Sequence, residues 1–355
     1  TSYTDKDITD IARLLEETRR TSWGKIPRIY TVLRLIGQIP FIESFLDEGL
    51  NDMWLPFKMS QLPSTMSGTA RNRFVECQNM VLTKAMNLEN TAIKRHTHFG
   101  KGEELPLDIG EELGQGGYGS VHQAYSPLSG RTYALKRFRR AKQNAREIES
   151  FMTELQILQR INHHHCIELV ASYTDSKFFG LLMAPVADCN LSAFYGHVAS
   201  NEANKKILRT FFGCLAHALQ FLHNSKVRHR DIKPENILVK GSAVYLADFA
   251  ISLDWESLTR STTTADSAKS WTYCAPEVAS HQKRNSSSDV WSLGCVFLEM
   301  AIVLEGFTTQ ELREAMCAHS GRCRFYENLE VCTEWIGRLD NQEDNSNNQI
   351  LSCIR

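Results

Sequence analysis

Three glycines, Gly114, Gly116 and Gly119, form a GxGxxG array in the first half of the chain. Because glycine has no side chain, backbone N–H groups in such an array can approach phosphate oxygens closely. A dinucleotide-binding fold needs a helix that begins within the array, whereas Val121 and residues 124–125 continue here as a returning strand. The array therefore predicts a phosphate-binding hairpin, for which this motif alone is weak evidence.

Two charged residues downstream fit the same chemistry. Lys136 stands at the end of an alternating strand, where its ammonium group could lie beside the phosphates of a nucleotide. Glu154 follows in an amphipathic helix predicted near residues 144–161, and its carboxylate could hold the lysine in place. Taken singly, a lysine at a strand end and a glutamate on a helix are most often solvated charges.

The most specific pattern is a run of motifs in the second half of the chain. Residues 227–239 read VRHRDIKPENILV, residues 246–250 read LADFA, residues 273–277 read YCAPE, and residues 288–294 read SDVWSLG. In their order and spacing these motifs resemble those of the eukaryotic protein kinase family, over residues 106–355. The whole-chain pattern also resembles kinases of filamentous fungi. The resemblance implies an α+β, bilobal protein kinase fold with a β-rich N-lobe and an α-helical C-lobe.

The resemblance implies transfer of the γ-phosphoryl group of ATP, with Mg²⁺ as the cofactor. This reaction mainly requires positioning and charge neutralisation. Asp231 matches the residue that accepts or orients the proton of the substrate hydroxyl, and Asn236 and Asp248 match the two Mg²⁺ ligands. Lys136 and Glu154 match the ion pair that positions the α and β phosphates.

Two positions favour Ser and Thr over Tyr as phosphate acceptors. Lys233, two residues after Asp231, matches the lysine that distinguishes Ser/Thr kinases from tyrosine kinases. Ser270, three residues before Tyr273, matches the small hydroxyl residue that in Ser/Thr kinases touches the catalytic aspartate and lysine. We therefore expect a protein serine/threonine kinase, whose partners are protein substrates with Ser or Thr acceptors.

The adenine base is expected between Val121 and Ala134 on one side and Leu238 on the other, an apolar sandwich that stacks a planar ring. Met183 matches the gatekeeper, and residues 184–186 match the hinge whose backbone groups bind adenine. The predicted nucleotide-binding residues are Leu113, Gly114, Gly116, Gly119, Val121, Ala134, Lys136, Glu154, Met183, Ala184, Val186 and Leu238.

The chain departs from the family pattern at two points. Ala250 stands where the family has the glycine of its DFG motif, which raises the cost of a positive φ by about 1 kcal/mol. The arginine that usually pairs with Glu277 lies beyond the end of this chain, so we expect a truncated C-lobe. A nucleotide-binding pseudokinase or scaffold is therefore the alternative, although Lys136, Asp231 and Asp248 are all present.

The surrounding sequence divides the chain into three parts. Residues 1–96 show apolar residues at helical spacing and predict an all-α region of unknown role, which could bind a regulatory partner. Residues 97–105 are polar and contain glycine, which predicts a linker. Residues 106–355 show short alternating runs and one amphipathic helix, and helices dominate after Leu191, as the kinase domain requires.

Composition argues against several classes of partner. Forty Lys and Arg against 41 Asp and Glu give no electrostatic reason to expect nucleic acid or an anionic membrane. No uncharged apolar run of about eighteen residues occurs and the N-terminus is polar, so we expect neither membrane insertion nor secretion. Ten cysteines without a CxxC pair are expected to be mostly reduced, buried thiols. These features predict an intracellular protein of the cytoplasm, with the nucleus as an alternative, and the missing initiator Met predicts a fragment of a longer protein.

Residues 163–165 are three successive histidines, a composition that also suits a metal site. They fall in the loop after the predicted helix of Glu154, where the family commonly has a histidine. Three adjacent histidines cannot all face one ion. The sequence therefore favours an ordinary loop over a metal site.

Overall fold

The computed structural model describes residues 2–83, 88, 96–101, 103–116, 119–140, 145–199, 201–249, 271–280 and 286–340. The chain divides into two compact units. The first holds residues 1–108, 125–131 and 170–176, and the second holds residues 109–124, 132–169 and 177–355. The sequence-based domain boundaries at 96, 105 and 106 stay a prediction.

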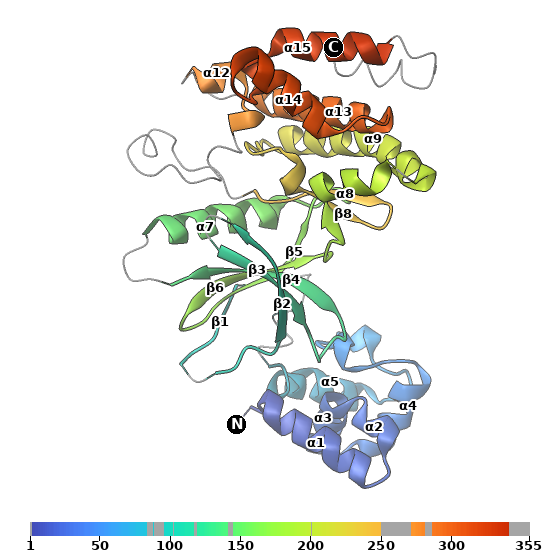
Figure 1. Cartoon of the computed structure of the whole chain (residues 1–355). Coiled ribbons are helices and arrows are strands. Elements are labelled where there is room, and N and C mark those ends of the chain that lie inside the picture. Colours follow the sequence, from blue (N-terminus) through green and yellow to red (C-terminus); the bar gives the residue numbers. More distant parts are fainter. Residues whose placement is uncertain are drawn as a thin grey trace. The chain divides into compact units, whose positions relative to one another are not determined.

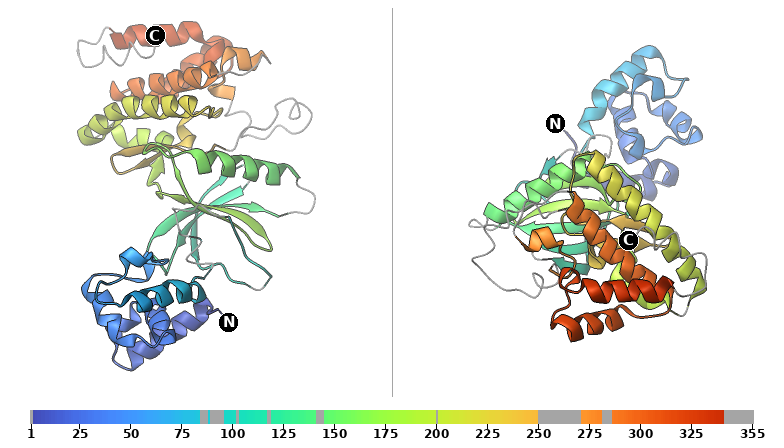
Figure 2. Two further views of the ribbon diagram at one scale, coloured as in Figure 1. Left: turned by 180° about the vertical axis from the view of Figure 1, so that it is seen from behind. Right: turned by 90° about the horizontal axis from the view of Figure 1, so that it is seen from above.

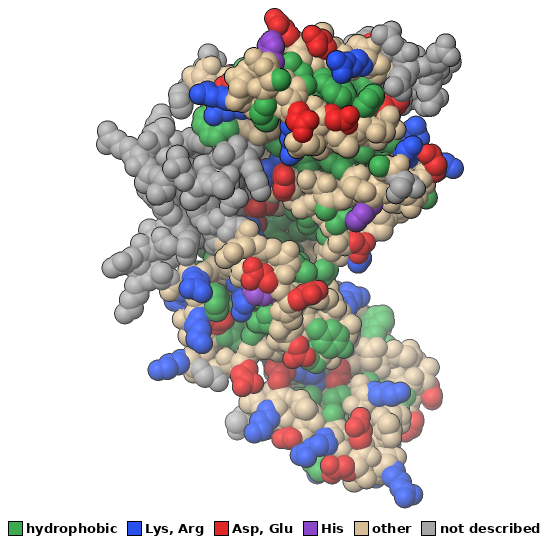
Figure 3. All heavy atoms as spheres, viewed as in Figure 1, with side chains coloured by type: hydrophobic (Ala, Val, Ile, Leu, Met, Phe, Trp, Pro, Cys, Tyr) green, Lys and Arg blue, Asp and Glu red, His purple; other side chains and the backbone are tan. Residues whose placement is uncertain are grey.

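The first unit begins with short helices, as the sequence predicted (Figure 1). The helix α1 (Asp5–Glu17) starts at a capping box, in which the Thr4 hydroxyl accepts from the Asp7 N–H at 3.2 Å and the Asp7 carboxylate accepts from the Thr4 N–H at 2.8 Å. The other helical segments are α2 (Thr21–Gly24), α3 (Pro27–Leu35), η1 (Ile39–Phe41), α4 (Ile42–Asp47), η2 (Asp52–Trp54), η3 (Met59–Gln61), α5 (Gly68–Cys77) and η4 (Gln78–Met80). Charged side chains of both signs are interspersed over this helical region (Figure 3).

A cluster of three phenylalanines forms the centre of this helical region. Phe45 and Phe74 stack with ring centroids 5.4 Å apart, and Phe57 packs edge-on against both. The buried carboxylate of Asp52 accepts the backbone N–H groups of Arg28 and Ile29, at 2.8 and 3.0 Å, in the first turn of α3. Burial raises the pKa of Asp52 to about 6, against the opposing effect of these two hydrogen bonds.

The helical region is followed by β1 (His96–His98), which pairs in parallel with β5 (Glu168–Thr174). In this register His96 lies opposite Ser172 and His98 opposite Thr174. The His96 ring also bonds through Nδ1 to the Ser172 hydroxyl at 3.0 Å and through Nε2 to the Thr174 hydroxyl at 2.7 Å. Thr97 and His98, which the sequence placed in a linker, thus belong to a strand.

We predict that Phe74→Ala selectively destabilises the helical region of the first unit. Removing a fully buried aromatic ring costs about 3–5 kcal/mol, because a cavity remains. Hydrogen exchange of the full chain should therefore speed up in peptides from residues 2–83. Leu14→Ala, at a side chain 54% exposed, is the control and should change the exchange little. Equal exchange in the two variants would show that the phenylalanine cluster is not the core of this region.

The second unit contains four neighbouring strands in the order β6-β4-β3-β2, of which β4 and β6 pair antiparallel. These are β2 (Asp108–Gly116), β3 (Gly119–Tyr125), β4 (Thr132–Arg139) and β6 (Phe178–Ala184). Pairing of β4 with β6 places Ala134 opposite Met183 and Lys136 opposite Leu181. Gly119 is required at the start of β3, because a Cβ atom there would overlap the carbonyl of Arg137.

The long helix α7 (Ala145–Arg160) packs against these strands and carries Glu154. Phe151 on α7 contacts Phe138 of β4 at 5.7 Å and Phe179 of β6 at 5.1 Å between ring centroids. A second, three-stranded sheet follows in the order β7-β8-β9. Its strands are β7 (Cys189–Asn190), β8 (Ile237–Lys240) and β9 (Ala243–Leu246).

The other elements described in the second unit are helical. They are α8 (Leu191–Val198), α9 (Glu202–Asn224), η5 (Pro234–Asn236), α12 (Pro276–Ala279), α13 (Ser287–Leu304), α14 (Thr309–Ser320), η6 (Phe325–Glu327) and α15 (Leu329–Asp340). Helices α9 and α13 lie side by side (Figure 2), and Phe212 contacts Phe297 between them at 4.9 Å. By length and hydropathy α13 could cross a membrane, but 72% of it is buried inside the fold, as expected of a core helix.

The cysteines follow the sequence expectation only in part. Cys166, Cys295 and Cys332 are free and buried. Four other free thiols, Cys77, Cys189, Cys214 and Cys274, are half-buried. Cys317 of α14 and Cys323 form a disulfide across the turn that ends this helix, a pairing that the sequence did not predict.

One of the two charges on α13, Glu299, is completely buried and needs partners. Its carboxylate accepts the Tyr273 hydroxyl at 2.9 Å, and the Arg313 guanidinium lies 3.4 Å away. Burial raises the pKa of Glu299 to about 7, although Arg313 and Tyr273 oppose the shift.

We predict that Glu299 makes stability depend on pH. The folded-state pKa is raised above the ordinary value of 4.5, so the folded state binds the proton more tightly than the unfolded state. The contribution is fully present below about pH 4.5 and is lost as the pH rises through 7. Wild type should therefore lose roughly 2–3 kcal/mol relative to Glu299→Gln between pH 4.5 and 7.5.

Thermal unfolding of both proteins across this pH range measures the effect. Glu330→Gln, at an exposed site on α15, is the control and should track the wild type at every pH. A constant difference between wild type and Glu299→Gln would mean that Glu299 does not titrate in this range.

Candidate active site

In the second unit, the ammonium group of Lys136 lies between two carboxylates. Nζ donates to both Glu154 oxygens at 2.9 Å and to Asp248 Oδ1 at 2.8 Å. Lys136 comes from β4, Glu154 from α7, and Asp248 from the segment after β9. The sequence predicted the pair of Lys136 with Glu154 but not the direct contact with Asp248.

Lys136 stabilises the charges of both carboxylates, whereas the two carboxylates repel each other. Burial acts to lower the pKa of Lys136, but Asp248 and Glu154 outweigh it and the pKa is raised, so the lysine stays charged. Burial raises the pKa of Glu154, and Asp248 adds to this, while Lys136 opposes it. Burial acts to raise the pKa of Asp248, but the charge of Lys136 outweighs it. The pKa of Asp248 is therefore lowered and this carboxylate stays ionised.

A second group of polar residues surrounds Asp231. Lys233 Nζ lies 2.8 Å from Asp231 Oδ2, and Asn236 Nδ2 donates to the same oxygen and to the Asp231 carbonyl, both at 2.8 Å. Because Nδ2 makes both hydrogen bonds, the Oδ1 oxygen of Asn236 is the one left to accept a cation. Asp248 offers a carboxylate that is 38% exposed. Both are hard oxygen donors of the kind that Mg²⁺ prefers, so the residues fit the predicted ion.

Asp289, at the start of α13, fixes the backbone that precedes Asp231. Its buried carboxylate accepts the N–H groups of His229 at 3.0 Å and Arg230 at 2.7 Å, and His223 Nε2 lies 3.0 Å away. Arg230 has φ +69° and Asp248 has φ +65°, in the left-handed region that costs non-glycine residues about 1–3 kcal/mol. The Asp289 and Lys136 contacts offset this strain at the two residues that flank the site.

A buried stack of side chains supports both groups. The rings of His229 and Phe249 lie 5.0 Å apart between centroids, and the His229 Nε2–H donates to the Ala247 carbonyl at 3.0 Å. Leu158 of α7 and Leu169 of β5 belong with Phe249 to the same hydrophobic core. Phe249 thus anchors the segment that carries Asp248 in the core to which α7 also contributes.

The predicted adenine-binding residues are apolar and half-buried. Val121, Ala134, Met183, Ala184, Val186 and Leu238 are all neither fully buried nor exposed, whereas Leu113 is exposed. Gly114 and Gly119 lie on β2 and β3, and Gly116 ends β2. Packing requires a glycine at position 119, because a Cβ atom there would overlap the carbonyl of Arg137. It does not require one at position 114, where a Cβ atom would meet no atom within 4 Å.

Two predicted features lie outside the described residues. Ser270, predicted to contact the catalytic aspartate, and Ala250, the departure from the family motif, both fall in residues 250–270. Their predicted roles stay predictions.

Comparison with known proteins supports the kinase interpretation of this site. A family model described as the protein kinase domain matches residues 107–348. The chain is 27% identical over 215 residues to mitogen-activated protein kinase kinase kinase A of Dictyostelium discoideum, covering 59% of this chain and 22% of that protein. It is 29% identical over 210 residues to mouse serine/threonine-protein kinase 33, covering 56% and 42%.

It is also 30% identical over 208 residues to human serine/threonine-protein kinase ULK3, covering 58% of this chain and 43% of that protein. The chain thus spans less than half the length of each of these relatives. The family match covers most of the chain and includes the residues gathered around Lys136 and Asp231. This chain belongs to the protein kinase domain family.

Proposed function

We propose that this chain is a protein serine/threonine kinase that transfers the γ-phosphoryl group of ATP to Ser and Thr hydroxyls of protein substrates. The observation that carries the proposal is the pairing of Asp231 with Lys233 and Asn236, in the same unit as the Lys136 cluster. The names of two relatives, both serine/threonine-protein kinases, support the choice of acceptor.

Each residue of the candidate active site has its own role in the proposed reaction. Asp231 accepts the proton as the substrate oxygen attacks the γ-phosphorus and the bond to the ADP oxygen breaks. Lys233 donates to Asp231 and places a positive charge beside the transferred group. Lys136 holds the α and β phosphates, positioned by Glu154. Bound at Asn236 and Asp248, Mg²⁺ would neutralise phosphate charge.

The alternative predicted from the sequence, a nucleotide-binding pseudokinase or scaffold, rests on Ala250 and on the length of the C-lobe. The described catalytic groups give it no support, because Lys136, Asp231 and Asp248 have the partners that phosphoryl transfer requires. A regulatory partner for the helical region, the absence of nucleic-acid and membrane partners, and a cytoplasmic location stay predictions.

We predict that Asp231→Asn abolishes phosphoryl transfer without abolishing nucleotide binding. Asparagine keeps the shape but cannot accept the proton, so the rate should fall by about 10²–10⁴-fold. Phosphate transfer from labelled ATP to a basic protein substrate measures the rate, and phosphoamino-acid analysis should show phosphoserine and phosphothreonine. Glu330→Gln is the control and should keep full activity. Undiminished labelling in Asp231→Asn, or labelled tyrosine alone, would contradict the proposal.

We predict that Glu154→Gln weakens the productive placement of ATP. The change removes a charged partner of Lys136 and leaves Asp248, so kcat/KM for ATP should fall roughly tenfold to hundredfold, as for one lost hydrogen bond between charged groups. Steady-state kinetics at varied ATP test this. Glu168→Gln, at an exposed residue that begins β5, is the matched control. Kinetics like those of the control would show that Lys136 needs no partner on α7.

A further inference from the structure

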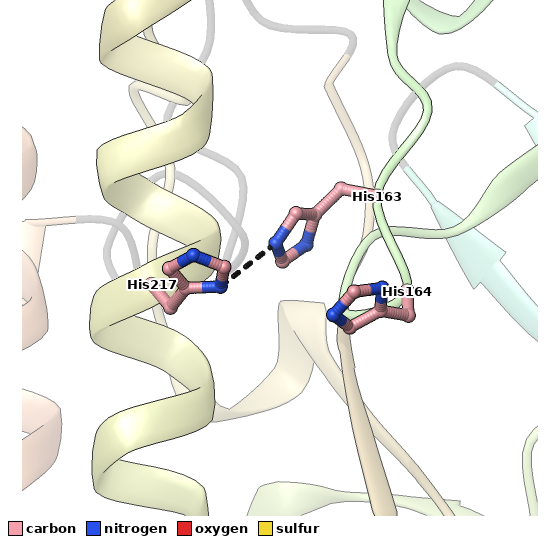
Figure 4. Close-up of side chains that lie close together, drawn as sticks. All are labelled: His163, His164 and His217. Atoms are coloured by element: carbon pink, nitrogen blue, oxygen red, sulfur yellow. Dashed lines mark hydrogen bonds between the residues drawn. The ribbon is translucent and has the colours of Figure 1, made fainter.

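Three histidines from two separate segments of the second unit gather at one place (Figure 4). His163 and His164 lie in the loop between α7 and β5, and His217 lies on α9. Each offers one ring nitrogen, and these nitrogens all lie within 4.8 Å of one another. The sequence argument that three adjacent histidines cannot share an ion is correct for His165, whose Nδ1–H donates to the Val244 carbonyl at 2.9 Å. The third histidine of the cluster is therefore His217 and not His165.

The spacing of two of the nitrogens suits a tetrahedral metal ion. His163 Nε2 and His217 Nδ1 are 3.1 Å apart. Two ligand nitrogens at Zn–N distances of 2.0–2.1 Å are separated by about 3.3 Å in a tetrahedral site. His164 is exposed, so a change of rotamer can bring its ring nitrogen from within 4.8 Å of the other two to the distance of a third ligand.

The loop and the helix hold these rings in position. The His163 ring stacks on Phe221 at 4.9 Å between centroids, one helical turn from His217 on α9. His163 Nδ1 also accepts the backbone N–H of His165 at 3.1 Å. Two of the three ligands are therefore partly preorganised, which reduces the entropy lost on binding.

The hydrogen bonds also define what an ion must displace. Because His163 Nδ1 is an acceptor, the proton of the neutral ring is on Nε2 and is donated to His217 Nδ1. An ion between these two nitrogens replaces that proton, which moves to Nδ1 and ends the bond from His165. The cost is two hydrogen bonds, the one between His163 and His217 and the one from His165.

We propose that His163, His164 and His217 form a binding site for a borderline divalent transition-metal ion of the Zn²⁺ class, with water as the fourth ligand. Imidazole nitrogens suit such ions, and the exposed face gives water access. Imidazole binds such an ion in its neutral form, through a ring nitrogen that carries no proton.

A bound ion would join two parts of the second unit. The loop of His163 follows α7, which carries Glu154, and α9 precedes the loop of Asp231. Because the ion binds the folded chain and not the separated segments, it should stabilise the fold by mass action. The site is distinct from the predicted Mg²⁺ ligands Asn236 and Asp248.

The test is metal binding by the full chain without nucleotide, in excess Mg²⁺ to occupy the carboxylate site. Zn²⁺ affinity is measured by competition with a chromogenic chelator, and Co²⁺ is used as a spectroscopic probe of geometry. Wild type should bind one ion with the visible absorption of a tetrahedral nitrogen site. His217→Ala should bind at least tenfold more weakly, and Zn²⁺ should raise the melting temperature of the wild type but not of this variant.

His197→Ala is the matched control, because His197 is exposed on α8 and outside the cluster, and it should bind as wild type does. If His217→Ala folds poorly, His164→Gln on the exposed loop tests the same site and should also lose at least tenfold in affinity. Unchanged affinity in a folded His217→Ala or His164→Gln variant would overturn the proposal. So would a Co²⁺ spectrum dominated by thiolate charge transfer, which would place the ion on cysteine.

Discussion

The second unit depends on one buried ammonium group. Lys136 sits between Glu154 and Asp248, and each of the three comes from a different element. Lys136 and Glu154 would not be tolerated alone in their buried positions, because an unpaired buried charge loses its hydration without compensation. Asp248, which is partly exposed, adds a second carboxylate to the lysine. The ion pairs of this cluster therefore link β4, α7 and the segment after β9. The same charged groups would face the phosphates of a bound nucleotide.

The helix α13 provides a second constraint of the same kind. Its two charges, Asp289 and Glu299, are buried on an otherwise apolar core helix, and each has polar partners from other elements. Asp289 holds the backbone before Asp231 in a conformation with positive φ at Arg230. The strained geometry next to the reacting groups is thus maintained by a residue that need not touch the substrate.

The sequence predicted the residues of the candidate active site but not the contacts that tertiary packing makes between distant residues. Lys136, Glu154, Asp231, Asn236 and Asp248 could be predicted as site residues because the motifs that hold them resemble those of the protein kinase family in residue type and order. Their roles in the reaction stay predictions. The contact of Lys136 with Asp248, and the joining of His217 to the loop of His163, unite residues far apart in sequence, for which no local pattern exists. His217 and Phe221 lie one turn apart on α9, and only the folded chain shows that both contact His163.

The strand β1 also escaped prediction, because its three residues are polar and gain strand structure only by pairing with β5. Its position has a practical consequence for where the chain can be cut. A fragment that starts at residue 106 would leave the backbone groups of β5 that now face β1 unpaired. The full chain ends this sheet with β1, a short polar edge strand, which is a poor template for pairing with another chain. The fragment would instead end it with β5, which is longer and mostly apolar, so we expect the fragment to aggregate more readily.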